Sequence, residues 1–527
     1  MRVPGLHAPA TADGLMSSRV RSVGAPAIER SNPMSSGTRT DISRFFRHSV
    51  IYTVGSALNR VGAFVLLPLY TNYLSPAQYG ILEILYAVSA IVSGVLSVGI
   101  AHAALRFYFD YESERDRHSV ISSNLHASFG ISVVGVGLAW AVGQPLVAMA
   151  LGSETPRWGY ALILVTVVLE LSSQICLAYL RAVEKSMFFV GVVLGKLLVQ
   201  CVANTYLVAT LGAGVDGVLG GNCLAVAAGW LVLVVYTVRQ CGWRFESEKV
   251  LPVLRYSLPF LYTTIVSVIV ANLDRFIIGK LLSLEALGLY ALAGRFGKLI
   301  ADLVGEPFAR SYGAFRFTVM NRPDAGAIQA QVVRLVSCLL AVISLGLIFF
   351  TIDVLRWMSS PTFWPAARLL PLLAFASSVT TLTYAFQTGV LVRKQTGELF
   401  RVSLIQNGIG LVSGIVLMVA FGVVGACVAV VLHALVGAWL THRASQKYFP
   451  VVYDWTKLML LCGFTVLAYG LSLPLEYLGH GTAFVGKLLI LAAFVVVVAR
   501  SRVLTPQERA MLVDRLSMLR ERMLSRT

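Results

Sequence analysis

The feature that most constrains the fold of this chain is a series of long apolar stretches. A helix needs about 20 mainly apolar residues to cross a bilayer, and a window of that length finds fourteen candidates in the 527 residues. They lie at about 48–73, 80–104, 119–142, 158–180, 187–210, 216–238, 256–279, 286–309, 335–355, 369–391, 402–421, 424–442, 458–475 and 483–499. Only a few residues separate the eleventh stretch from the twelfth, so twelve or thirteen spans remain open. The sequence therefore predicts an all-α polytopic membrane protein.

The composition agrees with this fold class. Apolar residues make up 57% of the chain and charged residues 13%, whereas soluble domains have about 45–50% and about 25%. The formal net charge is +17, from 43 Lys and Arg against 26 Asp and Glu. In a membrane protein, such a surplus usually reports basic cytoplasmic loops. A nucleic-acid partner is therefore not required.

The distribution of positive charge predicts the orientation. With fourteen spans and a cytoplasmic amino terminus, 33 of the 43 basic residues fall in cytoplasmic segments and five in outer loops or outer span ends. This asymmetry follows the positive-inside rule. We therefore expect both termini in the cytoplasm, with 1–45 as a disordered extension and 501–527 as an amphipathic tail.

The sequence carries no pattern of a known catalytic centre. Seven cysteines form no C-x-x-C pair, and the eight histidines form no H-E-x-x-H motif. No Walker A sequence is present, and the outer loops are too short for a catalytic domain. We therefore expect a protein that is not an enzyme, with no catalytic residue, no metal and no cofactor.

Ionisable residues inside the spans are the candidate functional groups. Each costs at least about 2.5 kcal/mol at the centre of a bilayer, so it usually faces a partner or a wet cavity. Basic residues predicted to line a water-filled cavity are Arg60, Lys196, Arg275, Arg295 and Lys298. Carboxylates predicted to serve in coupling or pairing are Glu83, Glu170, Asp274, Asp302 and Glu306. The excess of basic groups suits an anionic, phosphate-bearing substrate, because guanidinium binds phosphate bidentately.

Local pairing is the alternative interpretation of several of these charges. Asp302 lies four residues after Lys298 and can pair with it on one helix face. Asp274 can neutralise a neighbour. Small residues raise a separate expectation, since three G-x-x-x-G motifs would allow close helix contact. They are Gly191–Gly195, Gly217–Gly221 and Gly410–Gly414.

A short motif recurs in the chain. The pattern L-S-x-x-x-x-G joins the first two spans at 74–80 and the seventh and eighth spans at 282–288. An offset of six spans predicts two parallel six-helix repeats related by an axis along the membrane normal. We expect an amino-terminal bundle over 46–240, a second bundle over 241–446, and two further spans over 447–500.

Two hairpins resemble a known family. Residues 51–56 and 68–83, and residues 272–279 with 287–290, are similar to bacterial polysaccharide (O-antigen type) lipid-linked oligosaccharide flippases. These proteins belong to the multidrug/oligosaccharidyl-lipid/polysaccharide exporter superfamily. The resemblance covers all the spans in layout but only these hairpins in residues. By motif position it supports Asp274 and Arg275.

The resemblance implies both a fold and a function. The fold would be two six-helix bundles related by pseudo-twofold symmetry plus two C-terminal helices, V-shaped around a central cavity. The function would be to move undecaprenyl-diphosphate-linked oligosaccharide from the inner to the outer leaflet of the bacterial plasma (inner) membrane by alternating access, for polysaccharide or lipopolysaccharide biosynthesis. The implied partners are the lipid-linked glycan, membrane lipid, a polysaccharide polymerase and other assembly proteins.

Two other functions remain open. A multidrug or cation antiporter of the same superfamily would need a cavity dominated by carboxylates, whereas this one is predicted to be basic. A membrane polysaccharide polymerase is disfavoured by the short outer loops.

Overall fold

The computed structural model describes residues 62, 64–97, 99–152, 156, 158–477, 479–506 and 508–509. The chain separates into two units, Met1–Ile51 and Tyr52–Thr527, and everything below concerns the second. Arg60, the extension over 1–45 and most of the tail lie outside the described residues. The predicted bundle boundaries at 240, 446 and 500 remain predictions.

The described chain is helical throughout and contains no strand. This confirms the predicted fold class, because only helices or closed barrels satisfy backbone hydrogen bonds inside a bilayer. The elements of the first half are α2 (Leu67–Tyr73), α3 (Pro76–Ser97), α4 (Ile100–Asp110), α5 (Glu114–Leu151), α6 (Gly159–Ala182), α7 (Ser186–Asn204), the π-helical turn η2 (Thr205–Thr210) and α8 (Gly214–Cys241).

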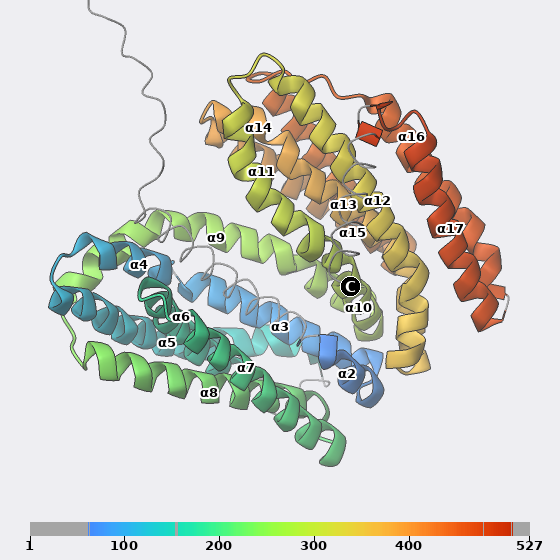
Figure 1. The fold of residues 1–527 in the computed structure, drawn as a ribbon. Coiled ribbons are helices and arrows are strands. Elements are labelled where there is room, and N and C mark those ends of the chain that lie inside the picture. The colour runs from blue at the N-terminus through green and yellow to red at the C-terminus, as the bar shows by residue number, and fades with distance from the viewer. Residues whose placement is uncertain are drawn as a thin grey trace, which may run out of the picture. The chain divides into compact units, whose positions relative to one another are not determined.

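The second half begins with the long helix α9 and ends with two helices beside α12 (Figure 1). Its elements are α9 (Ser247–Leu281), α10 (Leu284–Ile300), the π-helical turn η3 (Ala301–Gly305), α11 (Glu306–Val319), α12 (Ala325–Met358), the 3-10 helix η4 (Pro361–Leu369), α13 (Leu370–Phe386), α14 (Thr388–Val392), α15 (Thr396–Gln446), α16 (Trp455–Ser472), the 3-10 helix η5 (Leu473–Tyr477) and α17 (His480–Arg500).

Ten segments of the described chain are long and apolar enough to cross a membrane. Together they account for eleven of the fourteen predicted spans, since Thr396–Gln446 contains two of them. The seventh span corresponds to α9, and the eighth to α10 with η3 and α11. Only the end of the first span is described. The protein is therefore a multi-pass membrane protein.

The weakest predicted boundary, between spans eleven and twelve, falls at a real break in α15. Gly422 has φ 60° and ψ −138°, which is outside the helical region. Because glycine has no Cβ, it adopts this positive φ without the strain that other residues would meet. The break separates the two predicted spans at the position expected from the sequence.

Helix α3 is central to the packing because it contacts elements of both halves. It packs against α5, α6 and α8 on one side and against α9 and α10 on the other (Figure 1). The largest apolar core includes Leu82 and Leu85 of α3 together with Leu287 and Leu292 of α10. The charged residues of α3, α9 and α10 therefore meet inside a packed interior.

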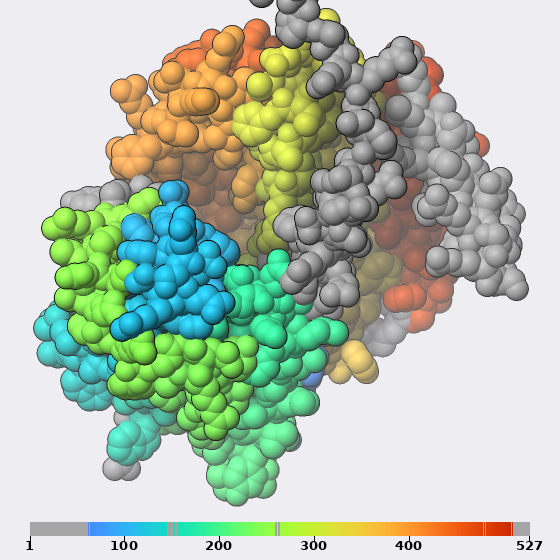
Figure 2. Space-filling view, turned by 60° about the vertical axis from the view of Figure 1, so that its left-hand side comes forward, coloured from blue at the N-terminus to red at the C-terminus, as the bar shows by residue number. Residues whose placement is uncertain are grey.

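A second contact region lies where α4 ends and α9 begins. Figure 2 shows residues of α4 next to the first part of α9. There Phe107 meets Tyr256 edge-on at 6.0 Å, and Lys249 binds Asp116 at 3.0 Å. Helix α9 therefore packs against first-half helices along much of its length, although it follows them in sequence.

The G-x-x-x-G motifs do not behave alike. A Cβ atom at Gly221 of α8 would collide with Asn204 of α7, so these helices approach closely, as expected. Gly191 and Gly195 differ, because no atom of the described residues lies within 4 Å of the position that a Cβ would take there. Within the described part of the chain, no close contact forms at this second motif. The spacing places two glycines on the same face of a helix, but it does not determine which element packs against that face.

Candidate functional site

The candidate site is a charged cluster where α3, α9 and α10 meet. Glu83 of α3 is buried, with 8% of its side chain exposed. Its Oε1 accepts a hydrogen bond from Arg295 of α10 at 2.8 Å, and its Oε2 accepts one from Nε of Arg275 of α9 at 3.5 Å. One carboxylate thus holds two guanidinium groups from two other helices. We call these three residues the Glu83 cluster.

Two further groups fix the position of Arg275. Asp274 lies next to it on α9, and the distance between their charged groups is 3.3 Å. The hydroxyl of Tyr290 donates to Asp274 Oδ2 at 2.9 Å. Arg275 also donates to the carbonyl of Ala271, one turn earlier, at 3.2 Å. Asp274 therefore neutralises its neighbour, and Tyr290 ties α10 to this part of α9.

The repeated L-S-x-x-x-x-G motif explains how these helices come so close. A Cβ atom at Gly80 would collide with the carbonyl of Leu284, and one at Gly288 would collide with the carbonyl of Pro76. Gly80 and Gly288 hold the same position in the two copies of the motif, as do Pro76 and Leu284. The contact between α3 and α10 is thus reciprocal, as expected for repeats packed about a twofold axis. We call it the α3–α10 junction.

Aromatic and polar contacts surround the Glu83 cluster on the α3 side. The guanidinium of Arg295 lies 5.2 Å from the ring centroid of Tyr79, a favourable cation–π arrangement. Tyr79 is fully buried and meets Phe363 of η4 edge-on at 5.7 Å. At the end of α2, the side chain of Asn72 donates to the carbonyl of Met358 at 3.0 Å. The α2–α3 hairpin is therefore fastened to α10, α12 and η4.

Lys196 and Glu170 form a second, looser pair on α7 and α6. Their charged atoms are 3.9 Å apart, with 31% and 47% of the side chains exposed. Glu170 lines a cavity of about 310 Å³ between α3, α6 and α8, where Ser89, Ser93, Thr166 and Asn222 supply further polar groups. This cavity begins at Tyr86, one turn beyond Glu83 on α3. It offers both hydrogen-bond donors and acceptors.

The remaining sequence candidates lie along α10 and the turn that follows it. Lys298 is exposed and has no ion-pair partner among the residues that the structure describes, so the expected pairing with Asp302 does not form. Asp302 instead falls in the π-helical turn η3, where the helical spacing between the two residues changes. Glu306 pairs with Arg310 at 3.2 Å near the start of α11.

The predicted excess of positive charge is therefore mostly compensated within the described chain. Of the basic candidates described, Arg275, Arg295 and Lys196 each contact a carboxylate, and Lys298 does not. A count of charges in the sequence shows how many bases a span carries but not which acid faces each of them. Any anionic ligand of the two arginines would have to share them with Glu83.

Sequence reasoning missed several contacts. The roles of Tyr79 and Tyr290 were not predicted, although both lie in the hairpins that carry the family resemblance. An ion pair joins the half-buried Asp353 of α12 to the buried Lys487 of α17 at 3.6 Å. The sequence signal that could have found this pair is an ionisable residue in each of two predicted spans, 335–355 and 483–499. Near the carboxyl end, Arg334 also binds Glu508 through a pair of hydrogen bonds.

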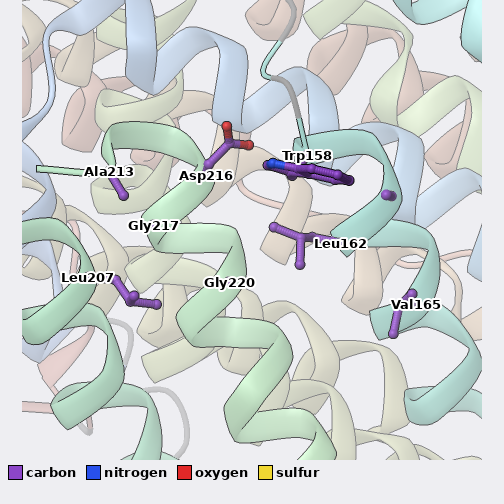
Figure 3. A pocket seen from close by; sticks show the side chains of 9 residues that line it. Trp158, Leu162, Val165, Leu207, Ala213, Asp216, Gly217 and Gly220 are labelled. Atoms are coloured by element: carbon purple, nitrogen blue, oxygen red, sulfur yellow. The ribbon is translucent and has the colours of Figure 1, made fainter. Parts of the chain in front are cut away.

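One further hollow is distinct from the polar cavity. A groove of about 490 Å³ lies between α6 and α8. It is lined by Trp158, Leu162, Leu207 and Gly220, with Asp216 at its edge (Figure 3). Its lining is otherwise apolar. No group of three or more His, Cys, Asp or Glu residues within the described part of the chain could hold a metal ion.

Comparison with known proteins shows what this chain is similar to. Residues 71–314 match the family model described as polysaccharide biosynthesis protein, a range that includes Glu83, Arg275 and Arg295. A search of curated proteins by sequence found no match. The resemblance inferred from the two hairpins is confirmed by this family match.

Solved structures show the same fold. Lipid II flippase MurJ in an inward closed conformation superposes with a TM-score of 0.62 at 14% identity, covering 86% of this chain and 99% of that one. A point mutant of the Vibrio cholerae MATE transporter VcmN gives 0.51 at 14% identity, covering 78% and 98%. An inward-facing multidrug resistance MATE transporter of the MOP superfamily gives 0.51 at 14% identity, covering 74% and 94%. The chain has the fold of these flippase and transporter structures.

Proposed function

We propose that the protein is a flippase that moves undecaprenyl-diphosphate-linked oligosaccharide from the inner to the outer leaflet of the bacterial plasma membrane. It would work by alternating access and serve polysaccharide or lipopolysaccharide biosynthesis. The family match to polysaccharide biosynthesis proteins and the fold shared with a lipid II flippase support this assignment. The nature of the charged site distinguishes it from other transport functions.

The observation that carries the proposal is the pair of arginines held at the contact between the two repeats. Arg275 and Arg295 lie in the helices that correspond to the seventh and eighth predicted spans, and they converge on one carboxylate from α9 and α10. Guanidinium groups bind phosphate oxygens bidentately and stay charged when partly buried. Two of them at one point match a diphosphate better than a neutral or cationic cargo.

The polar cavity along α3 would receive the sugars. It starts one turn from Glu83 and presents hydroxyl, amide and carboxylate groups from α3, α6 and α8. Sugar hydroxyls both donate and accept hydrogen bonds, so they need a mixed lining of this kind. Lys196 and Glu170 belong to this second part of the site. The lipid chain would remain in the bilayer.

Alternating access requires contacts that close one end of the path and later open. In the orientation predicted from the positive charges, α2 ends and α3 begins at the outer face. The α3–α10 junction and the bond from Asn72 to Met358 would then close the outer end in this state. Both termini would be cytoplasmic, and a polysaccharide polymerase would act on the released product.

A cation antiporter is the main alternative. It would need carboxylates open to a cationic drug, but Glu83 and Asp274 are both bound to arginine. Glu170 is the exception, because 47% of its side chain is exposed in the cavity. The antiporter hypothesis therefore predicts that Glu170→Gln abolishes drug resistance, whereas the flippase hypothesis predicts no effect on drug resistance from this change.

The test replaces both arginines in cells that depend on this protein for their surface glycan. Arg275→Gln with Arg295→Gln should abolish the surface glycan and cause lipid-linked oligosaccharide to accumulate in the inner leaflet. Arg322→Gln removes one positive charge from the loop before α12, where Arg322 pairs with Asp324 at 2.9 Å, and is the control. Glycan export at the normal level by the double variant, present in the membrane in normal amount, would overturn the proposal.

A further inference from the structure

The two arginines proposed to bind the substrate diphosphate are already bound to the carboxylate of Glu83. Each oxygen of the Glu83 carboxylate accepts a hydrogen bond from one of them, at 2.8 Å from Arg295 and 3.5 Å from Arg275. The carboxylate therefore takes the place between the guanidinium groups that a phosphate would take. An incoming anion and Glu83 cannot both make these bonds at full strength.

The two carboxylates of the site differ in how they are attached. Asp274 is the neighbour of Arg275 on α9 and accepts from the backbone N–H of Arg275 at 2.9 Å, so it moves with that arginine. Glu83 belongs to α3 and reaches α9 and α10 across the contact between the repeats. Loss of the Glu83 bonds would therefore remove the charged link from α3 to α9 and α10, whereas Asp274 joins α9 only to α10, through Tyr290.

The other contacts across the α3–α10 junction are of a different kind. Gly80 and Gly288 lie against backbone carbonyls and provide close fit without a side-chain interlock. Tyr79 meets Phe363 through an aromatic contact. The ion pairs of Glu83 are the charged link at this junction among the described residues, and they are also the contacts that an anion can replace.

We propose that Glu83 is an internal anion that competes with the lipid diphosphate for Arg275 and Arg295. Binding of the diphosphate releases Glu83 and frees α3 from α9 and α10, so that cargo binding is coupled to opening of the junction. When the cargo leaves, Glu83 returns to the arginines and closes the junction again. This inference rests on the proposed function and adds the residue that links binding to movement.

The experiment measures binding of farnesyl diphosphate, a short prenyl diphosphate, to the full-length protein in lipid nanodiscs. Glu83→Gln should bind it about tenfold more tightly than the wild type, because a charged competitor has been removed and tenfold corresponds to about 1.4 kcal/mol. Asp353→Asn is the matched control, since Asp353 is also a membrane-embedded carboxylate paired with a base, Lys487, at 3.6 Å. It should bind the probe as the wild type does.

A second measurement separates competition from a merely structural role. Glu83→Gln should lower the rate of glycan export while it tightens binding, because the junction no longer closes again. Asp274→Asn should not tighten binding. If Glu83→Gln proves unable to fold, Glu83→Asp keeps the charge but shortens its reach, and it should bind the probe more tightly than the wild type does.

The outcomes distinguish the two proposals. Unchanged or weaker binding by a folded Glu83→Gln protein, with the wild type binding the probe, would overturn the competition and leave the flippase assignment standing. The same holds for unchanged binding by Glu83→Asp where Glu83→Gln does not fold. Failure of the wild type and of Glu83→Gln alike to bind any prenyl diphosphate would overturn the proposed function itself.

Discussion

The Glu83 cluster and the pair of Glu170 with Lys196 are both acid–base contacts between helices, yet they are built differently. Glu83 has 8% of its side chain exposed and binds two arginines, with a shortest distance of 2.8 Å. Glu170 has 47% exposed and faces one lysine at 3.9 Å beside a cavity. The first contact joins three helices, and the second leaves both groups open to water.

The difference shows that a charge within a span is not by itself evidence of one role. A buried carboxylate that loses its partners keeps the full cost of desolvation. A half-exposed pair is screened by water and contributes little to stability. We therefore expect the Glu83 cluster to hold the junction and the Glu170 pair to serve a ligand. The predictions below test this contrast, from the largest expected effect to the smallest.

Removing the two carboxylates in turn tests the contrast directly. Glu83→Ala leaves two arginines without their shared partner and should destabilise the protein by about 3–5 kcal/mol. Glu170→Ala should cost less than about 1 kcal/mol, because its pair is loose and exposed. Thermal unfolding in detergent measures both. Equal losses of stability from the two substitutions would contradict the distinction between a buried structural cluster and an exposed pair.

The buried pair of Arg334 and Glu508 tests whether burial sets the strength of an ion pair between α12 and the segment after α17 as well. Arg334 Nε donates to both oxygens of Glu508 at 3.1 Å, and Thr505 caps the same carboxylate through its backbone N–H at 2.8 Å. Glu508→Gln should destabilise the protein by about 2 kcal/mol at neutral pH, the range for hydrogen bonds to charged groups. An effect as small as that of Glu170→Ala would show that burial is not decisive.

The same pair predicts a dependence on pH. Burial opposes ionisation of Glu508, but the bonds from Arg334 and Thr505 lower its pKa below the usual value of 4.5. A lowered pKa means that the stabilisation is complete above 4.5 and is lost as the pH falls through the folded value. The difference in unfolding temperature between the wild type and Glu508→Gln should therefore shrink below that pH. A difference that persists in acid would contradict the ion-pair origin.

The glycines of the α3–α10 junction test how much close packing contributes to the stability of this contact. Gly80→Ala places a methyl group against the carbonyl of Leu284 and should destabilise the protein by about 1–3 kcal/mol, as overpacking does. Gly191→Ala is the matched control on α7, where the added methyl meets open space. It should be neutral or slightly stabilising. Differential scanning fluorimetry of both variants gives the comparison.

Lys196→Gln carries the smallest expected effect on stability. Its pair with Glu170 is loose, so the free energy of unfolding should change by less than about 1 kcal/mol. If the cavity receives sugars, glycan export should nevertheless fall, because a charged hydrogen-bond donor is lost from its edge. Export and unfolding temperature measured on the same variant separate these effects. A large loss of stability would show that Lys196, like Glu83, holds helices together.

The sequence predicted the features that depend on local pattern. The apolar stretches mark the helices, and the recurring L-S-x-x-x-x-G identified the segments that pack against each other through Gly80 and Gly288. It also marked Glu83, Arg275 and Arg295 as unusual, because charge inside a span is costly. These inferences need only residue spacing and the properties of the bilayer.

The partners of the charges depend on tertiary packing and were not predictable. Glu83 lies far from Arg275 and Arg295 in sequence, and no spacing rule connects them. Lys298 and Asp302 have the spacing of a helical pair, but the π-helical turn η3 begins between them and changes their relation. Gly191 and Gly195 have the spacing of a contact motif, yet no described residue packs against them. In each case the neighbouring element decides the outcome.

The most direct test of the account is translocation by the purified protein in liposomes. The substrate is a fluorescent oligosaccharide linked to a polyprenyl diphosphate, and quenching from outside reports how fast it crosses. We predict that the wild type accelerates crossing and that the variant carrying Arg275→Gln and Arg295→Gln does not. Crossing at the wild-type rate by that variant, in correctly inserted form, would contradict the claim that these arginines bind the diphosphate.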